Sequence, residues 1–234
     1  MANTHPDLKN ITKFTININF IKNYFLHYFL ITEILQYNST NTSIPSTEAS
    51  AFPGNKEHLK TGHFRTMLKR YFFAADYFCK GKNVLDSCCG LGWGAYILSK
   101  FARNVNAFDS SSEIIKFCKK TWNRQNIHWQ TADAMDMSTI ENEYFDVVIA
   151  MESIEHFNYS DGEKYIGNLN NKLKTHGFLI GTSLFKSTRE EADAHCKTNP
   201  HHLYIYTLDE ISALLKKYFK DYAIISNWMF IGFK

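Results

Sequence analysis

Acidic residues follow four short apolar runs in the middle of the chain, each at the point where the run ends. They are Asp86, Asp109, Asp133 and the pair Glu152 and Glu155. If the runs are parallel strands, their carboxyl ends meet at one edge of a sheet, where open α/β proteins bind ligands. Carboxylates accept hydrogen bonds from hydroxyl and amino groups and attract cations. The pattern therefore predicts a site for a ligand that carries hydroxyls, an amine and positive charge.

The run that ends at Asp86 leads into a glycine-rich turn, Ser87-Cys88-Cys89-Gly90-Leu91-Gly92-Trp93-Gly94. Glycine accepts positive φ and lets a ligand approach the backbone, and the helix that follows offers unpaired N–H groups. A dinucleotide site would need glycine where Cys88 stands, and its pyrophosphate would be repelled by Asp86. An ammonium and a sulfonium would instead be attracted. The turn therefore favours S-adenosylmethionine, with an NAD-dependent oxidoreductase as the weaker alternative.

The fourth run is followed by Glu152-Ser153-Ile154-Glu155-His156, which offers a candidate base. A histidine, with an ordinary pKa of about 6.5, suits general-base catalysis on a hydroxyl. His156 is therefore the candidate catalytic base, with Glu155 or Glu152 orienting its ring. In the alternative interpretation, Glu155 and His156 only tie this loop to the helix that begins near Asp161.

These residues require an alternating strand and helix order to bring them together. The sequence predicts strands at 83–86, 104–108, 127–130, 145–150 and 178–182, and a closing hairpin at 222–225 and 228–233. It predicts helices at 94–102, 162–173 and 207–218, and a helix start at Ser110–Glu113, where hydroxyls can cap and a carboxylate suits the first turn. Such alternation predicts a three-layer α/β sandwich, mostly parallel, with an antiparallel strand at its edge.

The 234 residues accommodate one such domain and an appendage. We expect an N-terminal tail and aromatic segment over 1–55 and the α/β domain over 56–234. Within the N-terminal segment, apolar residues at helical spacing predict an amphipathic helix over 20–35. At the start of the α/β domain, a basic, aromatic helix is expected over 56–78. Residues 20–75 are expected to cover the ligand site as a lid.

Composition limits where the protein acts. The 20–35 segment contains charged residues, so it predicts no membrane-spanning helix and no signal peptide. Five cysteines without a repeated spacing indicate reduced thiols and a cytoplasmic location. A net charge of +3 is too small to indicate a nucleic-acid partner, and the lack of a dense basic stretch disfavours one. No motif specifies an oligomeric state.

The chain from Lys82 to Leu184 resembles class I S-adenosylmethionine-dependent methyltransferases. The matching stretches are V-L-D-S-C-C-G-L-G-W-G, V-N-A-F-D-S-S-S-E-I-I, A-D-A-M and F-D-V-V-I-A-M-E-S-I-E-H-F. Two positions depart from the family pattern. Cys88 replaces the usual first glycine, and Thr175-His176 replaces the usual Pro-Gly before the fifth strand.

The resemblance implies S-adenosylmethionine as cofactor and a role for each matching residue. It implies that Asp86, Gly90 and Gly92 border the methionine part of the cofactor, and that Asp109 holds the ribose. Asp133 with Ala134 would bind the adenine, Met151 would flank the methyl group, and Arg70, beside Tyr71, would close over the carboxylate. Cys88 and Ser110 are also expected to bind the cofactor. The reaction expected is methylation of a hydroxyl on a small-molecule or sugar-like acceptor. Its pocket is expected from the N-terminal segment and the 186–202 loop.

Two alternatives use the same residues differently. Glu152, Glu155, His156 and His202 resemble the metal-binding set of small-RNA 2′-O-methyltransferases, and carboxylates with imidazoles suit a divalent ion. Such an ion could lower the pKa of an acceptor hydroxyl. In the other alternative, the chain has kept the fold as a non-catalytic binding module, which the departure at Cys88 would fit.

Overall fold

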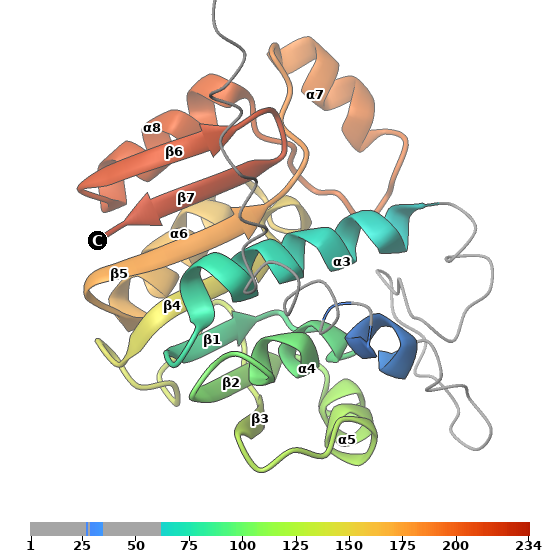
Figure 1. The fold of residues 1–234 in the computed structure, drawn as a ribbon. Coiled ribbons are helices and arrows are strands. Elements are labelled where there is room, and N and C mark those ends of the chain that lie inside the picture. Colours follow the sequence, from blue (N-terminus) through green and yellow to red (C-terminus); the bar gives the residue numbers. More distant parts are fainter. Residues whose placement is uncertain (1–26, 28, 35–61) are drawn as a thin grey trace, which may run out of the picture.

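A single seven-stranded sheet forms the centre of the molecule (Figure 1). The computed structural model describes residue 27, residues 29–34 and residues 62–234. The strands are β1 (Asn83–Ser87), β2 (Asn104–Asp109), β3 (Ile127–Thr131), β4 (Phe145–Met151), β5 (Leu173–Thr182), β6 (Asp221–Ile225) and β7 (Met229–Phe233). Their order is β3-β2-β1-β4-β5-β7-β6, and β7 runs antiparallel to both its neighbours. The predicted mixed sheet with a closing hairpin is therefore confirmed.

Helices cover both faces of this sheet. They are α3 (His63–Ala74), the π-helix η2 (Ala75–Cys79), α4 (Trp93–Ser99), α5 (Ser112–Thr121), the 3₁₀ turn η3 (Ile154–His156), α6 (Tyr159–Lys172), α7 (Arg189–Cys196) and α8 (Leu208–Tyr218). In Figure 1, α3 and α4 lie in front of the sheet, and α6 and α8 lie behind it. One apolar core joins α3, α4 and α5 to the front face, and a second joins α6 and α8 to the back. The arrangement is the three-layer sandwich that the alternating pattern predicted.

The strand order reverses between β1 and β4. From β1 the chain moves outward through β2 and β3, then crosses back to β4 and continues outward through β5. The register pairs Asp86 of β1 with Ile149 of β4, so these two strands end side by side. In open α/β sheets this point of reversal is where ligands bind. The turn after β1 and the loop after β4 both start there.

Several element boundaries differ from the sequence prediction. β5 begins at Leu173, earlier than expected, because its first residues pair with Phe145 before a register shift. The 186–202 region, expected as a loop, contains α7, whose start is capped by the side chain of Thr188. The predicted start of α8 at Thr207 is its N-cap, which forms a capping box with Glu210.

The N-terminal appendage lies mostly outside the described residues. Within the predicted 20–35 helix, residues 29–34 are helical, and Leu30 and Ile34 are fully buried in the front core. The proposed division at residue 55 and the rest of the lid fall outside the described ranges. No helix in the described part of the chain has the length and apolar character needed to cross a membrane.

Candidate functional site

Residues 88–92, which we call the glycine turn, reverse the chain between β1 and α4. Three residues of the turn have positive φ: Cys88 at 52°, Gly90 at 51° and Gly92 at 78°. A cysteine therefore adopts the left-handed conformation that glycine usually supplies, at some cost in backbone strain. A Cβ on Gly92 would lie 2.7 Å from Sγ of Cys118, whereas nothing lies within 4 Å of one on Gly90. The backbone at Gly90 is thus open to a ligand.

Asp86 is fully buried at the end of β1. The hydroxyl of Tyr71 donates to its Oδ1 across 3.3 Å, and its Oδ2 is buried without a hydrogen-bond partner in the described residues. Burial raises the pKa of this carboxyl to about 8, and the Tyr71 hydrogen bond offsets part of the rise. An unsatisfied, buried carboxylate oxygen is well suited to receive an ammonium group.

Asp109 connects the end of β2 to the glycine turn. Its Oδ2 accepts the Gly90 N–H at 3.1 Å, and its Oδ1 accepts the Ser111 N–H at 3.0 Å. Each carboxylate oxygen keeps further acceptor capacity. The carboxylate is therefore held in one orientation, next to the turn, with lone pairs left for a ligand's hydroxyls.

The remaining residues predicted to bind the cofactor lie at the same strand ends but differ in exposure. Asp133 is exposed and its Oδ1 accepts the Met135 N–H at 2.8 Å, while Ala134 is buried. Met151, the last residue of β4, is buried beside Thr182. Ser110 is exposed, and the N-cap of α5 is Ser111. The proposed contacts of Asp133, Ala134, Met151 and Ser110 with the cofactor therefore stay predictions.

Arg70 is held by partners within the chain. Its guanidinium forms an ion pair with Glu152 and lies 4.9 Å from the ring centre of Trp228. Glu152 has positive φ, 48°, which is strained for a side chain with a Cβ. Three separate parts of the chain, α3, the loop after β4 and the β6–β7 turn, therefore meet at this ion pair. Trp228 was not predicted as part of the site, because no motif marks it.

Residues 152–157, which we call the β4 loop, bring Glu155 and His156 close to His202. His156 shares a hydrogen bond at 2.9 Å between its Nδ1 and the backbone oxygen of His201, and its ring centre is 5.4 Å from that of His202. Glu155 is 2% exposed, and its backbone oxygen accepts the Leu203 N–H at 2.8 Å. Burial, and then the charge of Glu152, raise the pKa of Glu155 well above its ordinary value.

The same cluster fits the predicted divalent ion in part. One ligand atom from each of Glu155, His156 and His202 lies within 4.8 Å of the others. Glu155 Oε2 and His202 Nδ1 are buried and lack a hydrogen-bond partner in the described residues. This oxygen and nitrogen set suits a hard or borderline divalent ion. Glu152, which the metal alternative also included, pairs with Arg70 and is not part of this cluster.

Three buried hydroxyls at the site had no sequence signal. Tyr165 of α6 places its hydroxyl 2.8 Å from Ser87 Oγ and 3.0 Å from Ser153 Oγ. All three residues are at most 2% exposed. Serine and tyrosine are common residues, and nothing in their spacing predicts that α6 reaches between two strand ends.

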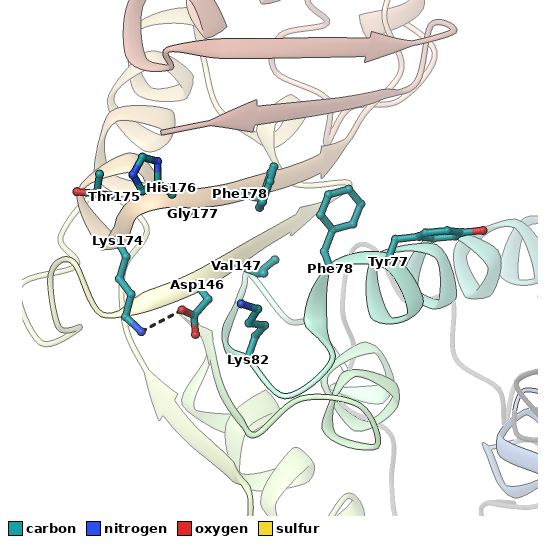
Figure 2. Close-up of a pocket in the computed structure, with 10 residues that line it drawn as sticks. All are labelled: Tyr77, Phe78, Lys82, Asp146, Val147, Lys174, Thr175, His176, Gly177 and Phe178. Atoms are coloured by element: carbon teal, nitrogen blue, oxygen red, sulfur yellow. Dashed lines mark hydrogen bonds and ion pairs between the residues drawn. The ribbon is translucent and has the colours of Figure 1, made fainter. Parts of the chain in front are cut away.

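A separate cavity of about 160 Å³ lies at the opposite end of the sheet (Figure 2). Its walls include Phe78 and Phe178, and its charged groups include an internal ion pair, with 3.0 Å between Lys174 Nζ and Asp146 Oδ1. Asp146 also accepts the Asn83 N–H at 2.8 Å. Its carboxylate is therefore satisfied within the chain. Because the cavity lies at the amino ends of β1 and β4, it is distinct from the candidate site.

Comparison with known sequences gives a consistent family signal. Residues 84–177 match the family described as "Methyltransferase domain". A ubiquinone biosynthesis O-methyltransferase of Coxiella burnetii is 29% identical over 149 residues, which cover 62% of this chain and 57% of that protein. The chain thus spans little more than half the length of that curated relative.

Comparison with solved structures shows a shared fold. An O-methyltransferase family protein from Burkholderia thailandensis superposes with a TM-score of 0.61 at 12% identity, covering 92% of this chain and 70% of that one. An S-adenosylmethionine-dependent methyltransferase from Archaeoglobus fulgidus gives a TM-score of 0.58 at 16% identity, covering 77% of this chain and all of that one, 100%. At these identities the likeness is one of fold.

Proposed function

We propose that residues 84–177, which match the family described as "Methyltransferase domain", form a class I, Rossmann-like domain that uses S-adenosylmethionine as methyl donor. In this proposal the protein transfers a methyl group from that cofactor to a hydroxyl. The proposed acceptor is a small molecule, or a sugar-like compound, with the hydroxyl next to His156. The O-methyltransferase relative supports oxygen as the acceptor atom.

The observation that carries this proposal is the arrangement of carboxylates around the glycine turn. The buried oxygen of Asp86 without a partner suits the cofactor's ammonium, and the fixed carboxylate of Asp109 suits its ribose hydroxyls. Asp133, exposed beyond β3, is proposed to accept from the adenine amino group. The open backbone at Gly90 leaves room for the cofactor between these groups.

Methyl transfer to a hydroxyl requires little covalent chemistry from the protein. The bound cofactor would supply a methyl group activated by its sulfonium, so that the acceptor oxygen could bond to the methyl carbon as the carbon–sulfur bond breaks, with S-adenosylhomocysteine as the leaving group and the acceptor's proton released. We propose that His156 takes this proton. Because a carbonyl oxygen can only accept, Nδ1 of His156 donates its proton to the hydrogen bond with His201. Nε2 is then unprotonated and can accept the proton of the acceptor hydroxyl. In this proposal the glycine turn holds the methyl donor and the β4 loop holds the acceptor, so that the two reacting groups are kept close together.

A metal-assisted form of the same transfer is the second candidate, because Glu155, His156 and His202 are close enough to share one ion. A divalent ion bound there would supply Lewis-acid stabilisation of the acceptor oxygen. In that case Glu155 and the two imidazoles would bind the ion, which would lower the pKa of the acceptor hydroxyl so that solvent water could take its proton without a histidine base. An RNA acceptor has little support, because the sequence has no lysine- and arginine-dense stretch and its net charge is only +3.

One transfer assay separates these possibilities. The purified chain is incubated with methyl-labelled S-adenosylmethionine and a panel of catechols, phenols and sugars, with and without chelator. We expect label in an acceptor, and His156→Ala should lower turnover about 100-fold, with cofactor affinity unchanged. His128→Ala, at an exposed position on β3, is the matched control.

Each outcome of the assay has a definite meaning. Turnover that disappears with chelator and returns with Mg²⁺ or Mn²⁺ supports the metal-assisted form. Normal turnover by His156→Ala removes the base role. Cofactor binding without transfer to any acceptor supports a non-catalytic module, and no binding by calorimetry contradicts the proposal.

We also propose a cytoplasmic location, which suits the five free cysteines and can be checked by cell fractionation.

A further inference from the structure

The glycine turn and the β4 loop are linked by the buried hydroxyls of Ser87, Tyr165 and Ser153. Ser87 is the last residue of β1, and Ser153 is the N-cap of η3. The Tyr165 hydroxyl lies between them, 2.8 Å from the first Oγ and 3.0 Å from the second. A phenol can donate one hydrogen bond and accept another, so it can bind both serines at once.

Backbone hydrogen bonds hold the two segments to opposite neighbours. In the glycine turn, the Cys89 N–H donates to Phe108 of β2 at 2.9 Å. In the β4 loop, the Glu152 N–H donates to Thr182 of β5 at 2.9 Å. The ladder between β1 and β4 ends with the pair Asp86 and Ile149, before either segment begins. The hydroxyl chain therefore spans the gap where the sheet's own pairing has stopped.

The ring of Tyr165 also supports the β4 loop directly. Its centre is 4.8 Å from that of Phe157, the residue after His156. Tyr165 itself is fully buried on α6, in the core behind the sheet. Its position is thus set by a packed helix rather than by either loop. A rigid group anchored outside both loops can fix the spacing between them.

From this geometry we propose that Tyr165 is a positioning residue for methyl transfer. It acts through Ser87 on the glycine turn and through Ser153 on the β4 loop, and it keeps the cofactor's methyl group at a constant distance from His156. The inference rests on the proposed function, because the turn must bind the cofactor for the spacing to matter. It also means that a ligand on the glycine turn steadies the β4 loop.

Hydrogen exchange measured by mass spectrometry tests this link without a known acceptor, with S-adenosylhomocysteine as the probe. In the wild type, the probe should slow exchange in both 88–92 and 152–157. Tyr165→Phe keeps the ring and removes only the hydroxyl. In this variant we expect slowing in the glycine turn and a roughly tenfold smaller protection in the β4 loop, where local opening is governed by fewer contacts.

Two further variants complete the experiment. Ser153→Ala removes the serine hydroxyl that binds Tyr165 from the β4 loop, and it should give the same result as Tyr165→Phe. It therefore serves as the test if Tyr165→Phe folds poorly. Tyr222→Phe is the matched control, because Tyr222 also binds one serine hydroxyl, that of Ser212 at 2.7 Å. It should behave as the wild type does.

The outcomes distinguish the two levels of the argument. Equal protection of the β4 loop in wild type and Tyr165→Phe, with the turn protected in both, overturns the positioning role alone. An equal loss in Tyr222→Phe also overturns it, because general loosening then explains the result. A wild-type turn that the probe does not protect overturns the proposed function and this inference together.

Discussion

At the scale of single residues, the proposed cofactor site contains carboxylates whose surroundings differ sharply. Asp109 has backbone N–H donors on both oxygens, whereas Asp86 is buried with one oxygen lacking a partner in the described residues. The carboxylate of Asp109 is held in one orientation, in which it can accept further hydrogen bonds from neutral hydroxyls. Burial disfavours the ionised form of Asp86 until a positive group approaches. The two residues should therefore respond differently to substitution and to pH.

Asp109→Ala should weaken binding of S-adenosylmethionine about 10- to 100-fold, since hydrogen bonds to a charged group contribute roughly 1.5–3 kcal/mol. Titration calorimetry measures the change. Asp221→Ala is the control, because Asp221 also accepts a backbone N–H, that of Tyr222 at 2.8 Å, on a distant strand. Unchanged affinity in Asp109→Ala would remove Asp109 from the ribose site.

Cofactor affinity should increase with pH because of Asp86. Its pKa of about 8 in the folded chain lies above the ordinary value of 3.8, so near pH 6 the folded protein holds a proton there. The groups that interact electrostatically with it, Tyr71, Cys79, Cys88 and Cys89, have raised pKa values and stay neutral. An ammonium requires the ionised carboxylate, so Kd should fall by up to about tenfold per pH unit from pH 6 to 8.

The same ionisation has a consequence for stability with the opposite sign. Between about pH 4 and 8 the folded state binds more protons at Asp86 than the unfolded state, so the free energy of unfolding falls as pH rises. Asp86→Asn should weaken both pH dependences. Calorimetry and urea unfolding at pH 6, 7 and 8 check this, with Asp221→Asn as control. A wild-type Kd that is flat across this range contradicts the Asp86 role.

At the scale of elements, the glycine turn combines backbone conformation with close packing. Gly92 and Gly81 have similar positive φ, 78° and 71°. A Cβ at Gly92 would lie 2.7 Å from Cys118 Sγ and from the Trp129 ring, while nothing lies within 4 Å of one at Gly81. The pair separates the cost of conformation from the cost of overlap.

Gly92→Ala should therefore lower the free energy of unfolding by about 1–3 kcal/mol more than Gly81→Ala, because only the first overpacks the core. Both variants share the cost of a left-handed alanine. Urea unfolding followed by circular dichroism measures the difference. Equal destabilisation would show that conformation alone requires glycine at position 92.

At the scale of the whole molecule, α3 connects the appendage to the site. Phe64 and Tyr71 of α3 both pack on Trp93 of α4, with ring centres 5.1 and 5.0 Å away. Arg70, the residue before Tyr71, pairs with Glu152 of the β4 loop. One helix therefore contacts both halves of the candidate site, so cofactor binding should stabilise the segment that leads into it.

Limited trypsin digestion tests the predicted lid. S-adenosylhomocysteine should slow cleavage within residues 20–75 several-fold, because only the opened state is cut. Cleavage after Lys216 and Lys217 of α8, on the back face, serves as the internal control. An equal rate of cleavage within residues 20–75 with and without S-adenosylhomocysteine would count against a lid.

The sequence alone determined the sheet, the strand ends and the family signal. Short apolar runs ended by Asp86, Asp109 and Asp133 predict parallel strands with acids at one edge, since side-chain burial and turn chemistry are local properties. The same reasoning predicted the glycine turn and the Glu155-His156 pair. These features needed no knowledge of which distant residues meet.

Only the tertiary structure decided which groups share a contact. It paired Arg70 with Glu152, which separates Glu152 from the cluster of Glu155, His156 and His202. It also placed Tyr165 between Ser87 and Ser153, although 78 and 12 residues separate it from them in the chain. Helix packing brings such residues together, and the periodicity of a sequence specifies which face of a helix is buried without specifying what that face meets.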